Sequence, residues 1–231
     1  LLQLPGVALL AGIWGSLTLA EKEAKKLRLK LQEVYNLVPL GLVAGLAGAR
    51  LAYAGRYLSV YLDDPLSLFA LNPNTLSPNW GLLIGVGVVI LYGWRKKLAV
   101  RSTLDVLTPG LALFMVFFAL ALFLSGDAFG APTQMPWAIY LWDDYRHPSQ
   151  IYEFLAAAGV FVLVWRWPQG KLGSGVNFLV FVALTAASRL FLEAFRGDST
   201  LLLEGIRAAQ PASLAILVGS LWFLRRWALE G

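Results

Sequence analysis

The stretch Thr103-Leu-Asp-Val-Leu-Thr-Pro-Gly-Leu-Ala-Leu-Phe-Met-Val-Phe-Phe-Ala-Leu-Ala-Leu-Phe-Leu-Ser125 contains a single charged side chain, that of Asp105. A helix needs roughly 20 mostly apolar residues to cross the hydrocarbon core of a bilayer, and this stretch has that length. It therefore predicts a membrane-spanning helix. The rest of the chain decides how many such helices accompany it.

The whole chain has the composition of an integral membrane protein. Of its 231 residues, 58% are hydrophobic and 14% are charged, whereas a soluble domain has roughly 45–50% apolar and about 25% charged residues. Cysteine is absent and His147 is the only histidine, which excludes disulfides, a thiolate nucleophile and a multi-histidine metal site. We therefore expect neither a metal nor a cofactor.

Further apolar stretches lie between breaks marked by charges, proline or glycine. Together with the first one they are residues 4–20, 34–55, 80–94, 103–125, 150–166, 174–192 and 209–226. The third is short for a span, and the others approach or reach the required length. We predict an all-α integral membrane protein, with a single domain over residues 1–231 and seven transmembrane helices.

Lysine and arginine are concentrated in loops on one predicted side of the membrane. The loops after the first and third stretches carry Lys22, Lys25, Lys26, Arg28, Lys30, Arg95, Lys96, Lys97 and Arg101. Short cytoplasmic loops retain such residues, so we predict an external N-terminus and a cytoplasmic C-terminus. The basic residues of these loops account for the net charge of +5. We therefore expect no nucleic-acid partner.

Two long connections fall on the predicted outer side. Residues 56–79 form an arm-like loop rich in turn-forming residues, and residues 126–149 form a second loop that leads into the fifth span. The run from Trp137 to Trp142 is rich in β-prone residues and predicts a short strand. We therefore expect the chemistry of this protein outside the cytoplasm.

Ionisable side chains at membrane depth are the strongest functional signal. Arg50 lies in the second span, and Arg189, Glu193 and Arg196 lie near the outer end of the sixth. An arginine at mid-helix costs roughly 2.5–3.5 kcal/mol on insertion scales, so these groups should face an interior. Their spacing allows an Arg-Glu-Arg ladder on one helix face. Such a ladder can tie helices together, or the arginines can converge on a phosphate.

The fifth span opens on the run His147-Pro148-Ser149-Gln150. Proline fits the first turn of a helix, and serine and glutamine can satisfy free amides there, so a helix start alone explains the run. His147 can also act as an acid or a base, because the unperturbed pKa of histidine lies near neutrality. Both interpretations stay open.

Several stretches together resemble one protein family. The run Arg146-His-Pro-Ser-Gln-Ile-Tyr-Glu153 is similar to the His-Pro-Ser-Gln signature of the bacterial prolipoprotein diacylglyceryl transferases. Further similar stretches follow in the family's order at residues 48–53, 64–69, 81–85, 125–133, 189–196 and 210–213. The resemblance implies a multi-pass enzyme of the bacterial cytoplasmic (inner) membrane. Such enzymes move the diacylglyceryl group of phosphatidylglycerol onto the lipobox cysteine of a preprolipoprotein.

The resemblance also implies roles for individual residues. Arg50 and Arg189 would bind the phosphate of the lipid. The residues that would surround and support these arginines are Glu193, Arg196, Gln150 and Gln210. His147 and Asp127 are the candidate catalytic groups.

The chain departs from the family pattern at several polar positions. Trp80 stands where the family has a histidine, and Asp127 replaces a glutamate. Ala119 and Leu122 stand where the family has an arginine and an asparagine. Removal of one pre-organised donor costs about 10²–10³ in rate. We therefore expect a catalytically degenerate protein that is a phospholipid-binding or scaffolding subunit of a membrane complex with other subunits. The alternative is an active phosphatidylglycerol:prolipoprotein diacylglyceryl transferase.

Overall fold

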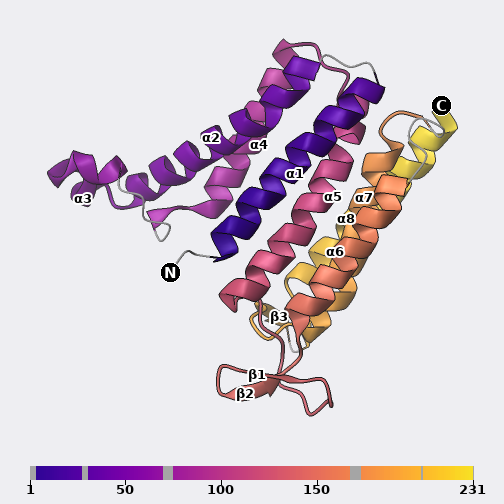
Figure 1. Ribbon diagram of the computed structural model, residues 1–231. Coiled ribbons are helices and arrows are strands. Elements are labelled where there is room, and N and C mark those ends of the chain that lie inside the picture. Colours follow the sequence, from indigo (N-terminus) through magenta and orange to yellow (C-terminus); the bar gives the residue numbers. More distant parts are fainter. Residues whose placement is uncertain (1–3, 28–30, 70–74, 167–172, 204, 231) are drawn as a thin grey trace. The chain divides into compact units, whose positions relative to one another are not determined.

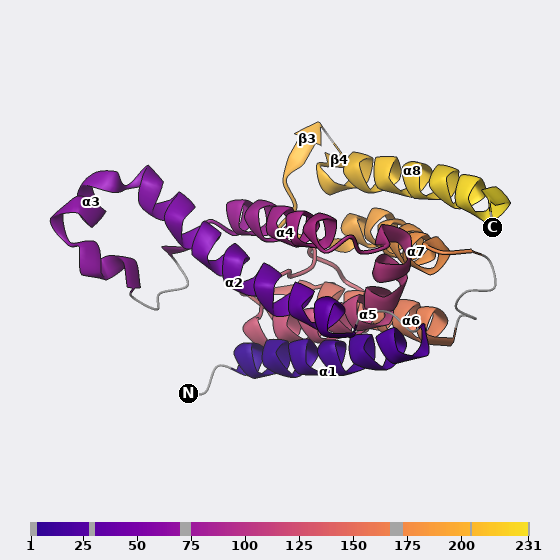
Figure 2. The same cartoon turned by 90° about the horizontal axis from the view of Figure 1, so that it is seen from above.

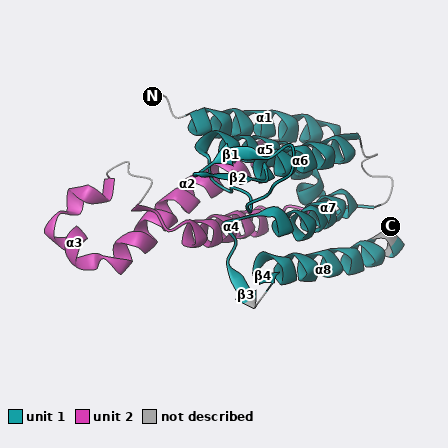
Figure 3. Ribbon diagram, turned by 90° about the horizontal axis from the view of Figure 1, so that it is seen from below, with its two compact units in different colours: residues 1–27, 101–231 teal, residues 28–100 magenta. Residues whose placement is uncertain are grey.

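The computed structural model describes residues 4–27, 31–69, 75–166, 173–203 and 205–230. The chain divides into two compact units (Figure 3). Unit 1 comprises residues 1–27 and 101–231, and unit 2 comprises residues 28–100. The expectation of one undivided membrane domain remains a prediction.

Long helices occupy all seven apolar stretches (Figure 1). They are α1 (Leu4–Lys26), α2 (Leu31–Arg56), α4 (Pro78–Arg95), α5 (Val100–Ser125), α6 (Ser149–Arg166), α7 (Val176–Leu192) and α8 (Ala209–Glu230). Among the described residues, α1, α2, α5 and α7 are long and apolar enough to cross a membrane. The class of all-α membrane protein is thereby confirmed. The number of seven crossings and the orientation remain predictions.

Small residues let the helices of unit 1 approach closely. The Ser16 hydroxyl on α1 donates a 2.7 Å hydrogen bond to the carbonyl of Gly110 on α5, and a Cβ on Gly110 would lie 2.7 Å from the Ser16 carbonyl oxygen. Only glycine permits this contact between backbones. α7 and α8 lie side by side in both views (Figures 1 and 2). The buried core is formed by Ala112, Val160, Val164 and Phe181, from α5, α6 and α7.

One buried carboxylate on α5 caps the start of α7. Asp105 accepts hydrogen bonds from the backbone N–H groups of Gly175, at 2.5 Å, and Phe178, at 2.9 Å. A capping side chain usually belongs to the helix that it caps, whereas this one is 70 residues away from Gly175. Gly175 has φ of +89°, a conformation that glycine adopts readily. The only charge in the stretch that predicts α5 therefore positions another helix.

Unit 2 is built on the helix pair α2 and α4, which pack along their glycines. A Cβ on Gly85 would lie 2.7 Å from the Gly41 carbonyl oxygen and 3.3 Å from the Gly45 Cα atom, so the two backbones touch. The predicted arm at residues 56–79 contains the short helix α3 (Leu58–Asp63) and the 3₁₀ helix η1 (Pro65–Phe69). The described part of the arm therefore contains helical turns where the sequence predicts a loop.

Two short hairpins join helices in the described part of unit 1. β1 (Ile139–Leu141) pairs antiparallel with β2 (Asp144–Arg146), which confirms a strand within the predicted run. Trp142 and Asp143 form the turn with φ of +54° and +58°, values typical of a two-residue hairpin turn. β3 (Leu201–Leu203) pairs with β4 (Ile206–Arg207) in a hairpin that the sequence does not predict. The 3₁₀ helix η3 (Glu193–Phe195) follows α7 directly.

Candidate functional site

A cavity of about 390 Å³ lies within unit 1 between α5, α6 and α7. This volume falls in the range of about 300–1,000 Å³ that is typical of small-molecule sites. Most of the lining is apolar, and it includes Ala112, Ala119 and Leu122 of α5, Ala157 and Val160 of α6, and Phe181 of α7. The lining also contains three charged residues, Glu153, Arg189 and Arg196.

The lining follows the helix axes from an apolar end to a charged end. Ala112 and Leu122 are ten residues apart on α5, a rise of about 15 Å, which is half of the roughly 30 Å hydrocarbon thickness of a bilayer. Glu153 lies in the first two turns of α6 and Arg189 in the last turn of α7. The charged end, defined by Glu153, Arg189 and Arg196, therefore lies at the helix ends, and the apolar end reaches about one leaflet deep.

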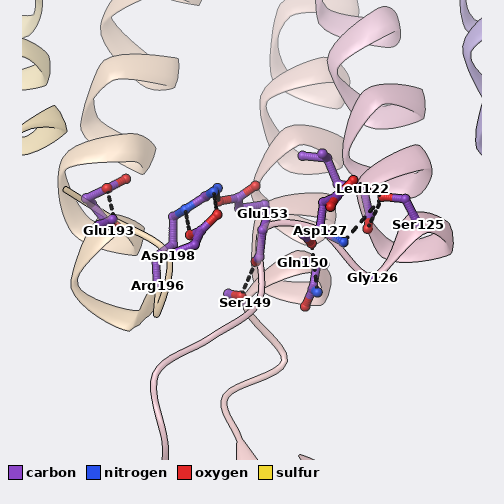
Figure 4. Close-up of polar contacts among 12 residues, drawn as sticks. Leu122, Ser125, Gly126, Asp127, Ser149, Gln150, Glu153, Glu193, Arg196 and Asp198 are labelled. Carbon is purple, nitrogen blue, oxygen red and sulfur yellow. Dashed lines mark hydrogen bonds and ion pairs between the residues drawn. The ribbon is translucent and has the colours of Figure 1, made fainter. Parts of the chain in front are cut away.

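The carboxylate of Glu153 joins the two arginines of the charged end. Its Oε1 lies 2.7 Å from Nη1 of Arg196 and 3.4 Å from Nη1 of Arg189. Arg196 also donates from Nε and Nη2 to Asp198, at 2.9 and 2.7 Å, and Figure 4 shows it between the two carboxylates. Burial lowers the pKa of Arg196, but its hydrogen bonds to Asp198 and Glu153 outweigh burial and raise the pKa above the ordinary value. Arg196 is thus charged, with all three guanidinium nitrogens engaged.

Glu193 supports Arg189 from the end of the same helix. Its Oε2 lies 2.9 Å from Nε of Arg189 as an ion pair without hydrogen-bond alignment, and its Oε1 accepts a 2.5 Å hydrogen bond from Ser199. The Arg189–Glu193 step of the predicted ladder is thereby confirmed. The Glu193–Arg196 step does not form among the described side chains. Because regular helix ends at Leu192, Arg196 leaves the helix face and pairs elsewhere.

The charges of this cluster nearly cancel. Arg189 and Arg196 contribute +2, and the carboxylates of Glu153, Glu193 and Asp198 contribute −3, so the sum is −1. The side chain of Arg189 is 41% exposed, against 11% for that of Arg196. Arg189 is therefore the arginine of the charged end that can contact a ligand.

Arg50 lies in unit 2, where it holds the arm. Its Nε donates to the Leu68 carbonyl at 2.9 Å, its Nη2 to the Ser67 carbonyl at 2.6 Å, and its Nη1 to Thr75. The guanidinium also lies over the ring of Tyr61, 5.7 Å from its centroid. These contacts give Arg50 a structural role in the arm. Its contact with a lipid phosphate stays a prediction.

The two candidate catalytic residues both lie in the connection between α5 and α6. Nδ1 of His147 is 3.4 Å from the Tyr152 hydroxyl, and the His147 ring packs on that of Phe195 with centroids 5.2 Å apart. Asp127 accepts a 2.7 Å hydrogen bond from the Ser125 hydroxyl. In the part of the chain that the structure describes, His147 and Asp127 share no hydrogen bond. A catalytic role for His147 or Asp127 stays a prediction.

The two predicted supporting glutamines hold connections between helices. Nε2 of Gln150 donates to the Asp127 carbonyl at 3.0 Å (Figure 4), and its buried Oε1 has no partner among the described residues. Gln210 accepts a 3.1 Å hydrogen bond from the backbone of Arg207, whose guanidinium donates to the Glu193 carbonyl. Gln150 therefore supports the α5–α6 connection, and Gln210 supports the hairpin β3–β4.

The departures from the family pattern fall in three places, of which the α5–α6 connection with Asp127 is described above. Ala119 and Leu122 line the cavity, so the wall is apolar where the family resemblance leads us to expect an arginine and an asparagine. Trp80 lies on α4 of unit 2, where about half of its surface is exposed.

Sequence reasoning missed two carboxylates that organise the charged end. Glu153 is within the run that carries the family resemblance, one turn after Ser149, but it was given no role. A carboxylate that close to the start of a span is expensive to leave unpaired, and this signal identifies it. Asp198 follows Arg196 by two residues in a connection, where local spacing gives no comparable signal.

The chain has clear relatives of known name. The sequence profile of the family described as prolipoprotein diacylglyceryl transferase matches residues 2–226. A phosphatidylglycerol–prolipoprotein diacylglyceryl transferase of Clostridioides difficile is 27% identical over 94% of this chain and 87% of that protein. Proteins of the same name are 28% identical in Thermosynechococcus vestitus, over 97% of this chain and 87% of the relative, and in Clostridium tetani, over 93% and 89%.

Proposed function

Because this chain belongs to the prolipoprotein diacylglyceryl transferase family, we propose that its cavity in unit 1 binds a membrane phospholipid. The relatives are named for phosphatidylglycerol, and an anionic glycerophospholipid is accordingly the proposed ligand. The chain is a multi-pass membrane protein. We place it in the cytoplasmic membrane of a bacterium, with the charged end facing outward.

The observation that carries this proposal is the polarity of the cavity. Its apolar length matches the depth of one leaflet, about 15 Å, which suits an acyl chain. Its charged end presents the partly exposed side chain of Arg189, and guanidinium groups bind phosphate oxygens through several donors at once. One acyl chain would therefore lie along Ala119 and Ala157, with the phosphate at Arg189.

We further propose that the chain does not carry out the transfer reaction. Transfer requires charge stabilisation on the departing glycerol phosphate, and pre-organised donors supply it. At the two family positions in the cavity wall, this chain presents Ala119 and Leu122, which donate no hydrogen bond. Arg196 is fully engaged by Glu153 and Asp198. The role of the protein would then be to hold lipid, with a place in a membrane complex as a further prediction.

The second candidate function is the transferase reaction itself. The observation that favours it is that Arg189 and Arg196, which lie in one of the family-like stretches, both pair with Glu153 at the cavity, and Glu193 of the same stretch pairs with Arg189. Under this alternative the preprolipoprotein supplies the thiol, since the chain has no cysteine. His147 or Asp127 would then take the proton.

Lipid binding is tested with purified protein and phosphatidylglycerol that carries a fluorophore on one acyl chain, because entry into an apolar cavity raises its emission. Ala119→Trp fills the cavity wall and should abolish most of the signal. Leu163→Trp is the matched control, since Leu163 is 53% exposed on α6 and does not line the cavity. Equal binding by the two variants would refute the proposed site.

The transfer reaction is tested separately with phosphatidylglycerol and a lipobox peptide. We expect no thioether product by mass spectrometry, although lipid binding is intact. Product formation that Arg189→Ala abolishes would establish the second candidate function and overturn the proposed degeneracy. Arg166→Ala, at the opposite end of α6, is the charge-matched control and should leave both measurements unchanged.

A further inference from the structure

The hairpin β1–β2 exposes an unusual set of aromatic side chains. Trp137, Tyr140, Trp142 and Tyr145 each expose more than half of their surface. The rings of Tyr140 and Tyr145 pack edge to face across the two strands, with centroids 5.4 Å apart. A water-surrounded surface rarely carries such a concentration of large apolar groups, and such a surface is typical of a site that contacts a partner or a membrane.

The two tryptophans are tied to the ends of the helices. The indole N–H of Trp142 donates to the carbonyl of Gly126, directly after α5, at 3.2 Å. The indole N–H of Trp137 donates to the hydroxyl of Tyr152, in the first turn of α6, at 2.7 Å. Both rings are therefore held at the level where these helices begin or end.

The hairpin β3–β4 lies at the same end of unit 1 and exposes aliphatic side chains. Leu201 and Leu202 expose more than half of their surface, and Ile206 nearly half. The connections that lead to the two hairpins are joined directly, because the N–H of Ala131 donates to the Phe195 carbonyl at 2.8 Å. Two hairpins far apart in sequence thus carry apolar surface at one end of the bundle.

Helix length places this end at the edge of the hydrocarbon. α6 has 18 residues, a rise of about 27 Å, and α7 has 17, a rise of about 26 Å. Both are shorter than the roughly 30 Å hydrocarbon core. If these helices cross the bilayer, the hairpin segment that precedes α6 and the one that follows α7 join them at or below the lipid headgroups.

We propose that both hairpins lie in the headgroup interface of the bilayer and fix the depth of the charged end of the cavity. Trp and Tyr favour this interface because each combines an apolar ring with a polar N–H or O–H group. The aliphatic side chains of β3–β4 would enter the outermost part of the acyl region. The partner is the lipid surface itself, and this inference does not depend on a lipid in the cavity.

The test uses nitroxide labels, for which the cysteine-free chain is well suited. Tyr140→Cys and Leu202→Cys place one label on each hairpin. Leu163→Cys, on the exposed face of α6, gives the hydrocarbon reference, and Lys22→Cys, exposed on α1, gives the aqueous reference. Collision rates with apolar oxygen and with a water-soluble nickel complex are measured in phosphatidylcholine vesicles.

Lipid immersion predicts an oxygen-to-nickel ratio several-fold higher for both hairpin labels than for Lys22→Cys, and at or below that of Leu163→Cys. Ratios equal to the aqueous reference would overturn the proposal. Low collision rates with both reagents, together with an immobilised spectrum, would show that a protein surface covers the hairpins and would also overturn it. Two labels on separate hairpins guard against misfolding of either variant, and circular dichroism verifies the helix content.

Discussion

Replacing Glu153 by glutamine should tighten the binding of an anionic phospholipid to this protein. The glutamine keeps an acceptor oxygen for Nη1 of Arg196, now 2.7 Å away, and removes the charge that lies 3.4 Å from Nη1 of Arg189. A phosphate on Arg189 would lie roughly 6 Å from this carboxylate, and two charges at that distance repel by about 3 kcal/mol at an effective dielectric constant of about 20.

Solvent reduces this repulsion, because the side chain of Arg189 is 41% exposed. We therefore expect a gain of about 1–2 kcal/mol, or roughly tenfold in affinity. The assay is displacement of the fluorophore-labelled lipid by unlabelled phosphatidylglycerol and, in parallel, by diacylglycerol, which carries no phosphate. Only the first lipid should gain affinity.

Asp198→Asn is the matched control for this experiment. It removes an equal charge from the far side of Arg196, where Asp198 accepts both of its hydrogen bonds from that arginine, so its effect should be smaller. An unchanged or weaker affinity of Glu153→Gln for phosphatidylglycerol, in a variant with a native circular dichroism spectrum, would refute the electrostatic reasoning. An equal gain for both lipids would show that the charged end does not meet the phosphate.

Three further predictions concern stability. Asp105→Ala leaves the buried N–H group of Gly175 and the partly buried N–H group of Phe178 without their acceptor and should cost about 2–4 kcal/mol. The cost would be seen as a lower unfolding temperature in detergent, and an unchanged temperature would contradict the capping role. Gly85→Ala should destabilise the folded protein by about 1–3 kcal/mol through overpacking. Gly87→Ala should not, because a Cβ there meets nothing within 4 Å. Equal effects of the two substitutions on chemical unfolding would argue against the close backbone contact. A hydrogen bond to Glu33 and the negative charge of Glu33 raise the pKa of Lys96 above its ordinary value of 10.5. This pair therefore stabilises the folded state below that pH, and its contribution is lost as pH rises through the raised pKa. In alkaline unfolding curves, Lys96→Met should lack this loss of stability.

The helices could be predicted from sequence because their cause is local. In lipid, a backbone must satisfy its own hydrogen bonds, so an apolar stretch such as residues 103–125 has few alternatives to a helix. The short strand within residues 137–142 could be predicted for a similar reason, from its β-prone side chains and the turn that follows. The run Leu201–Leu203 is too short to give a comparable signal, and its hairpin was missed.

The candidate site could be predicted only in part. Arg189 and Glu193 are four residues apart on one helix, so their ion pair follows from helical spacing. The pairing of Arg196 with Glu153 joins residues 43 positions apart, and no local pattern specifies it. The carbonyl partners of Arg50 likewise became evident only when the arm was placed around it.

The sequence by itself determined that this is a membrane protein, where its helices lie along the chain and, through its motifs, which family it belongs to. Each of these depends on hydropathy or on residues close together in the chain. The tertiary structure alone decided that Ala119 lines a cavity, that Glu153 joins two arginines, and that Asp105 caps α7. The physical reason is that desolvated charges and free amides take whichever partner packing brings within a few ångströms, and sequence distance does not limit that choice.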